Sequence, residues 1–191
     1  MSPFDTAAGA IAITTSSTHS GGVEAAMTSV APSIRYFEDE TLETLLSLLG
    51  LEAGDLDVRF PPREVFTGNW HPILVLSDAT VFHQFRFWPP AVAELKQARG
   101  WAGTVTVLHE AAANDFLARN LFPAGRITED PATGSAAAAV GAYLRFSGYS
   151  HGGDRISIHQ GAHVGRPSLL TAVIPAEGGI TVLGSATPIG A

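Results

Sequence analysis

Apolar residues recur at helical spacing in three stretches of the first hundred residues. The first stretch carries leucines at positions 42, 45, 46 and 49, which fall on one face of a helix. Residues typical of helix starts precede each stretch, and glycines follow two of them. The pattern predicts helices over residues 39–49, capped by Asp39 and ended by Gly50; after Ser77 or Asp78; and over residues 91–99, started by Pro89 and Pro90 and ended by Gly100.

Shorter apolar runs, bounded by glycine, proline and polar residues, indicate β-strands. The first two runs are joined by a polar segment that contains Gly21 and Gly22, so they are predicted to form a hairpin. The predicted strands are residues 8–15, 23–30, 63–67, 73–76, 104–108, 116–122, 155–159, 169–174 and 180–183, with a short tail over 186–189.

Residues 133–146 form the most unusual stretch of the chain. Small and apolar residues occupy every face of the helix that this stretch predicts, and Arg145 is its only charged residue. A helix that is apolar on all faces is buried on all faces. Because predicted strands lie both before and after it, we expect an α+β fold in which a curled, mostly antiparallel sheet wraps around a central helix.

Composition narrows the classes of function. The 191 residues carry 11 basic and 18 acidic side chains, a net charge of -7, which argues against a nucleic-acid partner. There are no cysteines, so disulfides, thiolate metal sites and cysteine-based catalysis are excluded. No apolar run approaches the ~20 residues that span a bilayer, and no leader pattern is visible, so we expect a cytoplasmic protein without a membrane partner.

One polar segment, residues 129–135 (EDPATGS), lies directly before the predicted buried helix. Thr133 or Ser135 can cap the helix, and Gly134 lets the backbone approach a ligand. The free N–H groups of a helix start bind carboxylate or phosphate. Asp130 beside them can accept a proton or a hydrogen bond from an amine or hydroxyl. By spacing alone, an ordinary capped helix with an acidic residue before it is the more typical interpretation of these residues.

The remaining polar residues admit simpler interpretations. Residues 160–168 could aim His163 or Arg166 at a site, or form an ordinary turn. Arg119 is expected to be a structural partner of a nearby carboxylate. A metal site is not expected, because Gly161 lies between His159 and His163 and disfavours a helix that would align them. A further histidine, at position 71, is either a loop residue or part of a cleft.

Several segments together resemble the PhzF-like (phenazine-biosynthesis-like) isomerases, which have the diaminopimelate-epimerase fold. The resemblance rests on EDPATGSAAAAVGAYL with residues 118–123 before it, on QGAHVGRPS, on residues 66–69 followed by 73–76, and on residues 184–189. These segments occur in the order that the family has. Zero cysteines favours this branch of the fold over the diaminopimelate epimerases and proline racemases, which use a cysteine pair.

The resemblance implies two domains with a ligand cleft between them and a proton transfer that uses no cofactor and no metal. It implies that Asp130 and Ser135 are catalytic residues facing this cleft. It further implies a set of residues that bind the carboxylate of a small metabolite: Thr133, Gly134, Ser135, Gly68 and Asn69.

The acid/base residue of the family is a glutamate in the first domain, assisted by a histidine in a PFxGH motif, and neither motif occurs in these residues. The chain therefore resembles the last two-thirds of the family fold. On this basis residues 1–31 are expected to be strands of the first domain, residues 32–184 the second domain, and residues 185–191 a closing strand. Glu129 is not expected to replace the missing base, because neighbouring side chains diverge.

Two hypotheses follow. The chain is a component of a cofactor-independent isomerase or epimerase whose acid/base comes from a second copy or a separate first-domain chain. Alternatively, it is an inactive homologue that acts by binding a small anion or by assembly. Both predict an apolar surface that an oligomer would cover.

Overall fold

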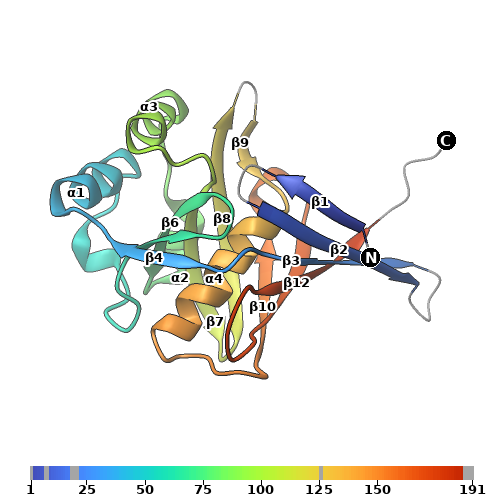
Figure 1. Ribbon diagram of the computed structural model, residues 1–191. Coiled ribbons are helices and arrows are strands. Elements are labelled where there is room, and N and C mark those ends of the chain that lie inside the picture. Colours follow the sequence, from blue (N-terminus) through green and yellow to red (C-terminus); the bar gives the residue numbers. More distant parts are fainter. Residues whose placement is uncertain (1, 7–8, 18–21, 125–126, 187–191) are drawn as a thin grey trace.

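The computed structural model describes residues 2–6, 9–17, 22–124 and 127–186 (Figure 1). Its helices are α1 (Asp39–Leu48), α2 (Ala79–Gln84), α3 (Pro89–Arg99) and α4 (Gly134–Phe146), with single 3-10 turns at Ala53–Asp55 and Ala162–Val164. Its strands are β1 (Ser2–Thr6), β2 (Gly9–Ser17), β3 (Val23–Thr28), β4 (Ser33–Tyr36), β5 (Arg63–Phe66), β6 (Trp70–Leu76), β7 (Val105–Ala112), β8 (Asp115–Ala124), β9 (Ile127–Asp130), β10 (Arg155–Gln160), β11 (Ser168–Val173) and β12 (Thr181–Ala186).

The described strands form one mixed sheet in the order β1-β2-β3-β12-β11-β10-β8-β7-β6-β5-β4, with β9 paired to β8. Two neighbouring pairs are parallel, β6 with β7 and β8 with β10. The connection between β6 and β7 carries α2 and α3, and the connection between β8 and β10 carries α4. Parallel strands need such crossover connections, which place these helices against the sheet.

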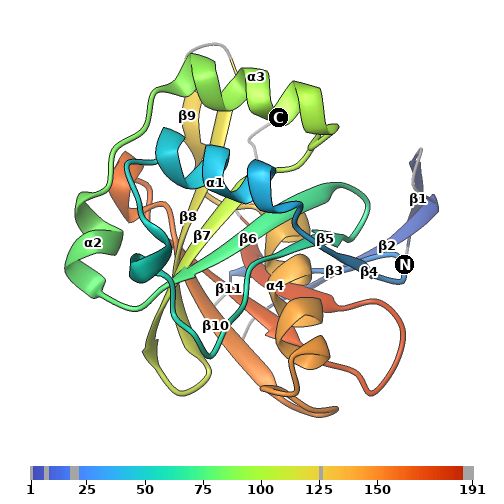
Figure 2. The same ribbon diagram turned by 90° about the vertical axis from the view of Figure 1, so that its left-hand side faces the viewer.

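The helices lie on opposite faces of the central strands. Ile73 and Val75 of β6 belong to the core cluster around α4, whereas Leu74 and Leu76 belong to the cluster with α1, α2 and α3. This alternation follows from the two-residue period of a strand. Figure 2 shows α1, α2 and α3 gathered on one side of the strands.

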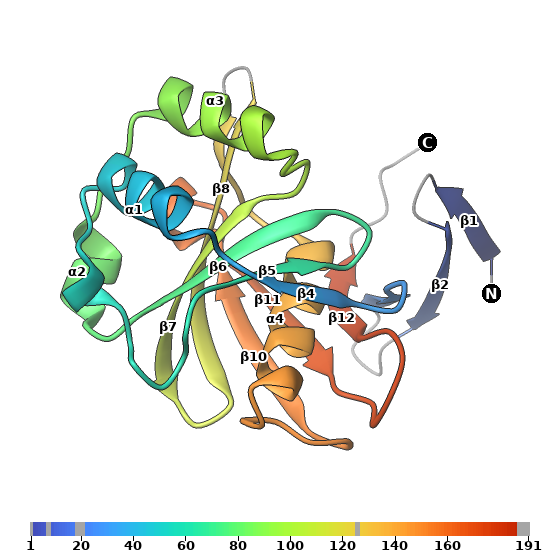
Figure 3. The same ribbon diagram turned by 60° about the vertical axis from the view of Figure 1, so that its left-hand side comes forward.

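Helix α4 is the centre of one core cluster. The side chains from Ala136 to Leu144 are at most 2% exposed. The helix contacts β5 and β6 on one side and β11 and β12 on the other (Figure 3). At Gly141 a side chain would meet Ile174 and Ile180, each 2.9 Å from a Cβ placed there. The prediction of a buried helix in an α+β fold is therefore confirmed.

Most predicted elements are confirmed with ends shifted by one to four residues. The predicted hairpin is β2 paired antiparallel with β3, and Gly50 and Gly100 follow their helices with positive φ. Asp78 caps α2 by accepting hydrogen bonds from two N–H groups of its first turn. Asp39 as a cap was wrong: the position before α1 is Glu38, and it makes no side-chain capping bond.

Strands β1, β4 and β9 were not predicted. Residues 187–189 of the predicted tail lie outside the described residues, and β12 ends at Ala186. None of the helices in the described ranges is long and apolar enough to cross a membrane. The division of the chain into domains at residues 31 and 184 stays a prediction.

Candidate functional site

A cavity of about 180 Å³ opens where β9 leads into α4. It is lined by Asn69, His71, Ala102, Gly103, Thr104, Phe122, Asp130, Thr133 and Ser135. The fold thus brings together four of the predicted site residues, Asn69, Asp130, Thr133 and Ser135. Two larger cavities, of about 250 and 280 Å³, flank Phe146 at the opposite end of α4, and their lining residues include no carboxylate within the described chain.

The other two predicted site residues stand beside this lining. Gly134 is the first residue of α4. Gly68, with φ of 115°, makes the turn between β5 and β6 that presents Asn69. A positive φ of this kind favours glycine, so the turn depends on that residue.

The first turn of α4 leaves its N–H groups available. The first hydrogen bond within the helix runs from the N–H of Ala137 to the carbonyl of Thr133 (3.0 Å). The N–H groups of Gly134, Ser135 and Ala136 precede it and have no acceptor within the helix. Together with the helix dipole they favour an anion at this position.

Thr133 holds the cap position, but the prediction that its hydroxyl caps the helix was wrong. The hydroxyl instead donates to Oδ2 of Asp130 (2.7 Å), and no side-chain capping bond is present at this helix start. Ser135 lies inside the helix rather than before it. The consequence is that Thr133 orients the carboxylate of Asp130, while the helix N–H groups remain open to a ligand.

Gln160 supports this arrangement from β10. Its Nε2 donates to the carbonyl of Asp130 (2.6 Å) and to the hydroxyl of Thr133 (2.9 Å), and its Oε1 accepts from the Thr133 N–H (3.2 Å). The hydroxyl of Ser168 donates to the carbonyl of Pro131 (2.7 Å). The segment 160–168 therefore works as a scaffold for the loop before α4, and His163 and Arg166 are not among the residues that line the cavity.

The sequence left His71 either in a loop or in a cleft, and the structure places it in the lining of this cavity. It lies on β6 rather than in a loop, and its side chain is fully buried. Its Nδ1 lies 3.0 Å from the N–H nitrogen of Thr104, and its Nε2 lies 3.1 Å from Oγ of Ser135. Burial lowers the pKa of His71 to about 4, so the ring is neutral at physiological pH. Extending the alternation of Ile73 and Val75 back by two positions would have placed His71 on the α4 face.

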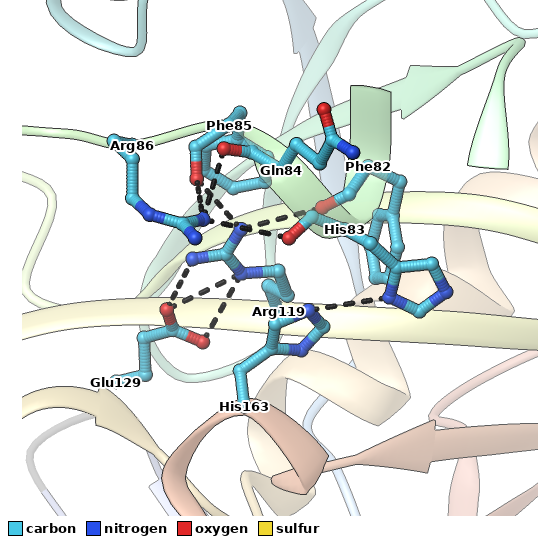
Figure 4. A network of polar contacts seen from close by, with 8 residues as sticks. All are labelled: Phe82, His83, Gln84, Phe85, Arg86, Arg119, Glu129 and His163. Atoms are coloured by element: carbon cyan, nitrogen blue, oxygen red, sulfur yellow. Dashed lines mark hydrogen bonds and ion pairs between the residues drawn. The ribbon is translucent and has the colours of Figure 1, made fainter. Parts of the chain in front are cut away.

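Glu129 points to a different environment from Asp130, because successive side chains of a strand alternate. Its carboxylate is buried and pairs with Arg119 at 2.6 Å (Figure 4). Arg119 also donates to the carbonyls of Phe82 and Phe85 at the end of α2. The expected structural partner of Arg119 is thus Glu129, and the same ion pair holds the strand that carries Asp130.

Three histidines near this ion pair, His83, His159 and His163, line a separate cavity of about 180 Å³. His163 contacts His83, with 3.3 Å between their ring nitrogens, and His159 contacts Asp115 at 3.1 Å (Figure 4 shows the first pair). Burial lowers the pKa of His163. Among the described residues, no group of three or more histidine or acidic side chains could hold a metal ion.

Comparison with known proteins agrees with this architecture. An uncharacterized isomerase from Deinococcus radiodurans is 33% identical over 137 residues, which are 70% of this chain and 44% of that protein. The trans-2,3-dihydro-3-hydroxyanthranilate isomerase of Pseudomonas chlororaphis is 34% identical over 90 residues, 44% of this chain and 32% of that protein. The matched regions span less than half the length of either relative.

A solved structure described as a predicted epimerase, from Pseudomonas aeruginosa, superposes with a TM-score of 0.76 at 27% identity. The match covers 95% of this chain and 64% of that one. The family described as "Phenazine biosynthesis-like protein" matches residues 1–189. The chain belongs to the phenazine biosynthesis-like family.

Proposed function

We propose that the cavity at the start of α4 binds the carboxylate of a small metabolite and that the chain takes part in a cofactor-independent isomerase or epimerase reaction. The observation that carries the proposal is the pairing of opposite hydrogen-bonding characters in one cavity. The open N–H groups of the helix start and the Ser135 hydroxyl are donors, and the Asp130 carboxylate that lines the same cavity is an acceptor. A ligand that carries a carboxylate next to an amine or hydroxyl satisfies both.

Each residue has a distinct role in this proposal. Gly134 and Ser135 bind the ligand carboxylate through their backbone N–H groups, with Asn69 and Thr133 at its edge. Asp130 accepts a hydrogen bond from the amine or hydroxyl of the ligand and holds the reacting carbon in place. Thr133 and Gln160 keep the carboxylate of Asp130 oriented.

The proton itself is moved by a group that this copy of the chain does not place in the cavity. Glu129 is engaged by Arg119, so it is not free to serve as the base. The family resemblance implies a glutamate, supplied by a second copy of the chain or by a separate first-domain chain, and a homo-oligomer fits the first alternative.

We further propose a cytoplasmic location and a sheet that curls around α4 as in one half of a diaminopimelate epimerase. Binding or assembly without catalysis is the alternative.

Binding of two probe acids tests the site. Benzoate offers a carboxylate alone, and anthranilate adds an amine beside it. We expect both to bind by titration calorimetry, with anthranilate about tenfold tighter because it also reaches Asp130. Asp130→Asn should remove the difference, Ser135→Ala should weaken both, and Glu177→Gln, at an exposed carboxylate, is the matched control. Equal affinity of the wild-type chain for the two acids would count against the role of Asp130.

Proton exchange separates the two functions. Deuterium from heavy water should enter trans-2,3-dihydro-3-hydroxyanthranilate, or a related amino acid, only when a chain bearing the glutamate is present with this one. Exchange by the purified chain alone would show that the base lies within these residues, either in the same copy or in a second one. Binding without exchange in either mixture supports the alternative of an inactive binding protein.

A further inference from the structure

We infer that His71 is a positioning residue that donates a hydrogen bond to Ser135 and so makes the Ser135 hydroxyl a donor to the ligand, not a nucleophile. The inference deepens the proposed function and rests on it for the identity of the ligand. It starts from three residues brought together by β6, by the segment before β7, and by α4: His71, Thr104 and Ser135.

The tautomer of His71 follows from its contact with Thr104. The backbone N–H of Thr104 points at Nδ1 with 3.0 Å between the nitrogens. Nδ1 must therefore be the acceptor, because a hydrogen on it would face the hydrogen of that N–H. The Thr104 hydroxyl, 3.1 Å from Nδ1, donates to the same atom, since the Thr106 hydroxyl already donates to Oδ1 of Asn120 (2.7 Å). The carbonyl oxygen of Thr104 is the more distant contact, 3.3 Å from Nδ1. A neutral imidazole with an acceptor at Nδ1 carries its hydrogen on Nε2.

The hydrogen on Nε2 fixes the role of Ser135. Nε2 lies 3.1 Å from Oγ of Ser135, so the ring donates and the serine oxygen accepts. The serine hydrogen is then directed away from His71. Thr67 donates to the Ser135 carbonyl (2.8 Å), which anchors the backbone of the same residue. The free O–H lines the cavity beside the N–H groups of α4 and adds a donor for a carboxylate.

The opposite tautomer would give a different chemistry. With its hydrogen on Nδ1, the ring would accept the Ser135 proton at Nε2 and activate the serine as a nucleophile. Such an arrangement uses a carboxylate or carbonyl to accept the Nδ1 hydrogen. Here the Thr104 N–H lies closer to Nδ1 (3.0 Å) than the Thr104 carbonyl oxygen does (3.3 Å) and points its hydrogen at that atom, so Ser135 remains an unactivated hydroxyl.

Nitrogen NMR of the free chain tests the tautomer without any ligand. We expect the His71 ring to show the neutral form with hydrogen on Nε2, unchanged from about pH 8 down to about pH 5, well above its lowered pKa. A ring with hydrogen on Nδ1, or one that titrates near the ordinary histidine value, would overturn the inference. Because no ligand is involved, this result is independent of the proposed function.

A double-mutant cycle with benzoate tests the coupling. His71→Leu should weaken benzoate binding about tenfold, and His71→Gln, which keeps an N–H near Nε2, should restore most of it. In a Ser135→Ala background, His71→Leu should have no further effect, since its action runs through that hydroxyl.

Additive effects of His71→Leu and Ser135→Ala would overturn the coupling and leave carboxylate binding standing. If His71→Leu fails to fold, His71→Phe, which keeps a ring but has no N–H, supplies the cycle with Ser135→Ala. Failure of the wild-type chain to bind benzoate would refute the proposed function, and the tautomer measurement would still decide the hydrogen bond between His71 and Ser135.

Discussion

Gly103 leaves the space that the ring of His71 occupies: a Cβ placed on Gly103 would lie 2.5 Å from Cε1 of that ring and 2.7 Å from both of its nitrogens. The ring is fully buried, and its two nitrogens contact Thr104 and Ser135. A side chain at Gly103 must therefore displace either the ring or the backbone.

Gly103→Ala should accordingly lower the free energy of unfolding by about 1–3 kcal/mol, as overpacking of a rigid core does. It should also weaken benzoate binding, because the ring is moved away from Ser135. Urea denaturation and calorimetry measure the two effects. Gly54→Ala is the matched control, since a Cβ at Gly54 meets nothing within 4 Å. Equal stabilities of the two variants would contradict the prediction.

The neighbouring acids Glu129 and Asp130 should respond in opposite ways to the loss of charge. Glu129→Gln breaks a buried ion pair and leaves Arg119 without its carboxylate, so it should cost about 3 kcal/mol of stability. Asp130→Asn should change stability by less than about 1 kcal/mol and abolish the preference for anthranilate over benzoate. Denaturant titration measures the loss of stability in each variant, and the binding assay measures its preference between the two acids. A stable Glu129→Gln variant with lost binding would reverse their assigned roles.

Acid should destabilise the fold through His71. Its pKa is about 4 in the folded chain because of burial, against an ordinary value of 6.5, so the unfolded chain binds more protons between these values. The stability due to the neutral ring is fully present above about pH 6.5 and is lost as the pH falls toward 4. The loss should reach up to about 3 kcal/mol.

His71→Gln removes this group and is the control. The wild-type curve of unfolding free energy against pH should fall more steeply than that of the variant between about pH 6.5 and 4. Parallel curves would mean that His71 is not held neutral.

Gly161 supports the loop before α4 by its lack of a side chain. Its φ is +82°, and a Cβ there would meet the carbonyls of Arg166 and Pro131. Gly161→Ala should cost about 3 kcal/mol, from the strained backbone and the contact together. Gly165→Ala, with φ of +70° and nothing within 4 Å, isolates the backbone strain and should cost about 1 kcal/mol. Thermal unfolding of both variants checks the difference, and equal costs would contradict the role of the Pro131 contact.

The parts of the fold that the sequence predicted are those where one physical signal dominates. Residues 133–146 are apolar on every face, and α4 is buried on every face. A run of leucines before a glycine became α1. Strands β4 and β9 are only four residues long, and they carry one and two charged residues respectively, which leaves too short an apolar pattern to predict a strand. Their pairing is supplied by the neighbours β5 and β8.

The part of the site that the sequence predicted is the part that has a local signal. Asp130, Thr133 and Ser135 are close in sequence to a helix start, which is a local signal. His71 reaches Ser135 across 64 positions and its other partner, Thr104, across 33 positions. Such contacts follow from sheet order, which the pattern of residues did not determine.

The pairing of β3 with β12 has a consequence for how the chain folds. Thr28 and Thr181, whose hydroxyl oxygens are 2.9 Å apart, are separated by 153 positions in the sequence. Closing a loop of this size costs about 4 kcal/mol of chain entropy beyond a constant. The interactions between β3 and β12 must offset this cost. Among the described strands, β1, β2 and β3 join the rest of the sheet only through that ladder. They should therefore dock after the strands around α4 and exchange their amide hydrogens as one cooperative unit at lower opening energy than the rest.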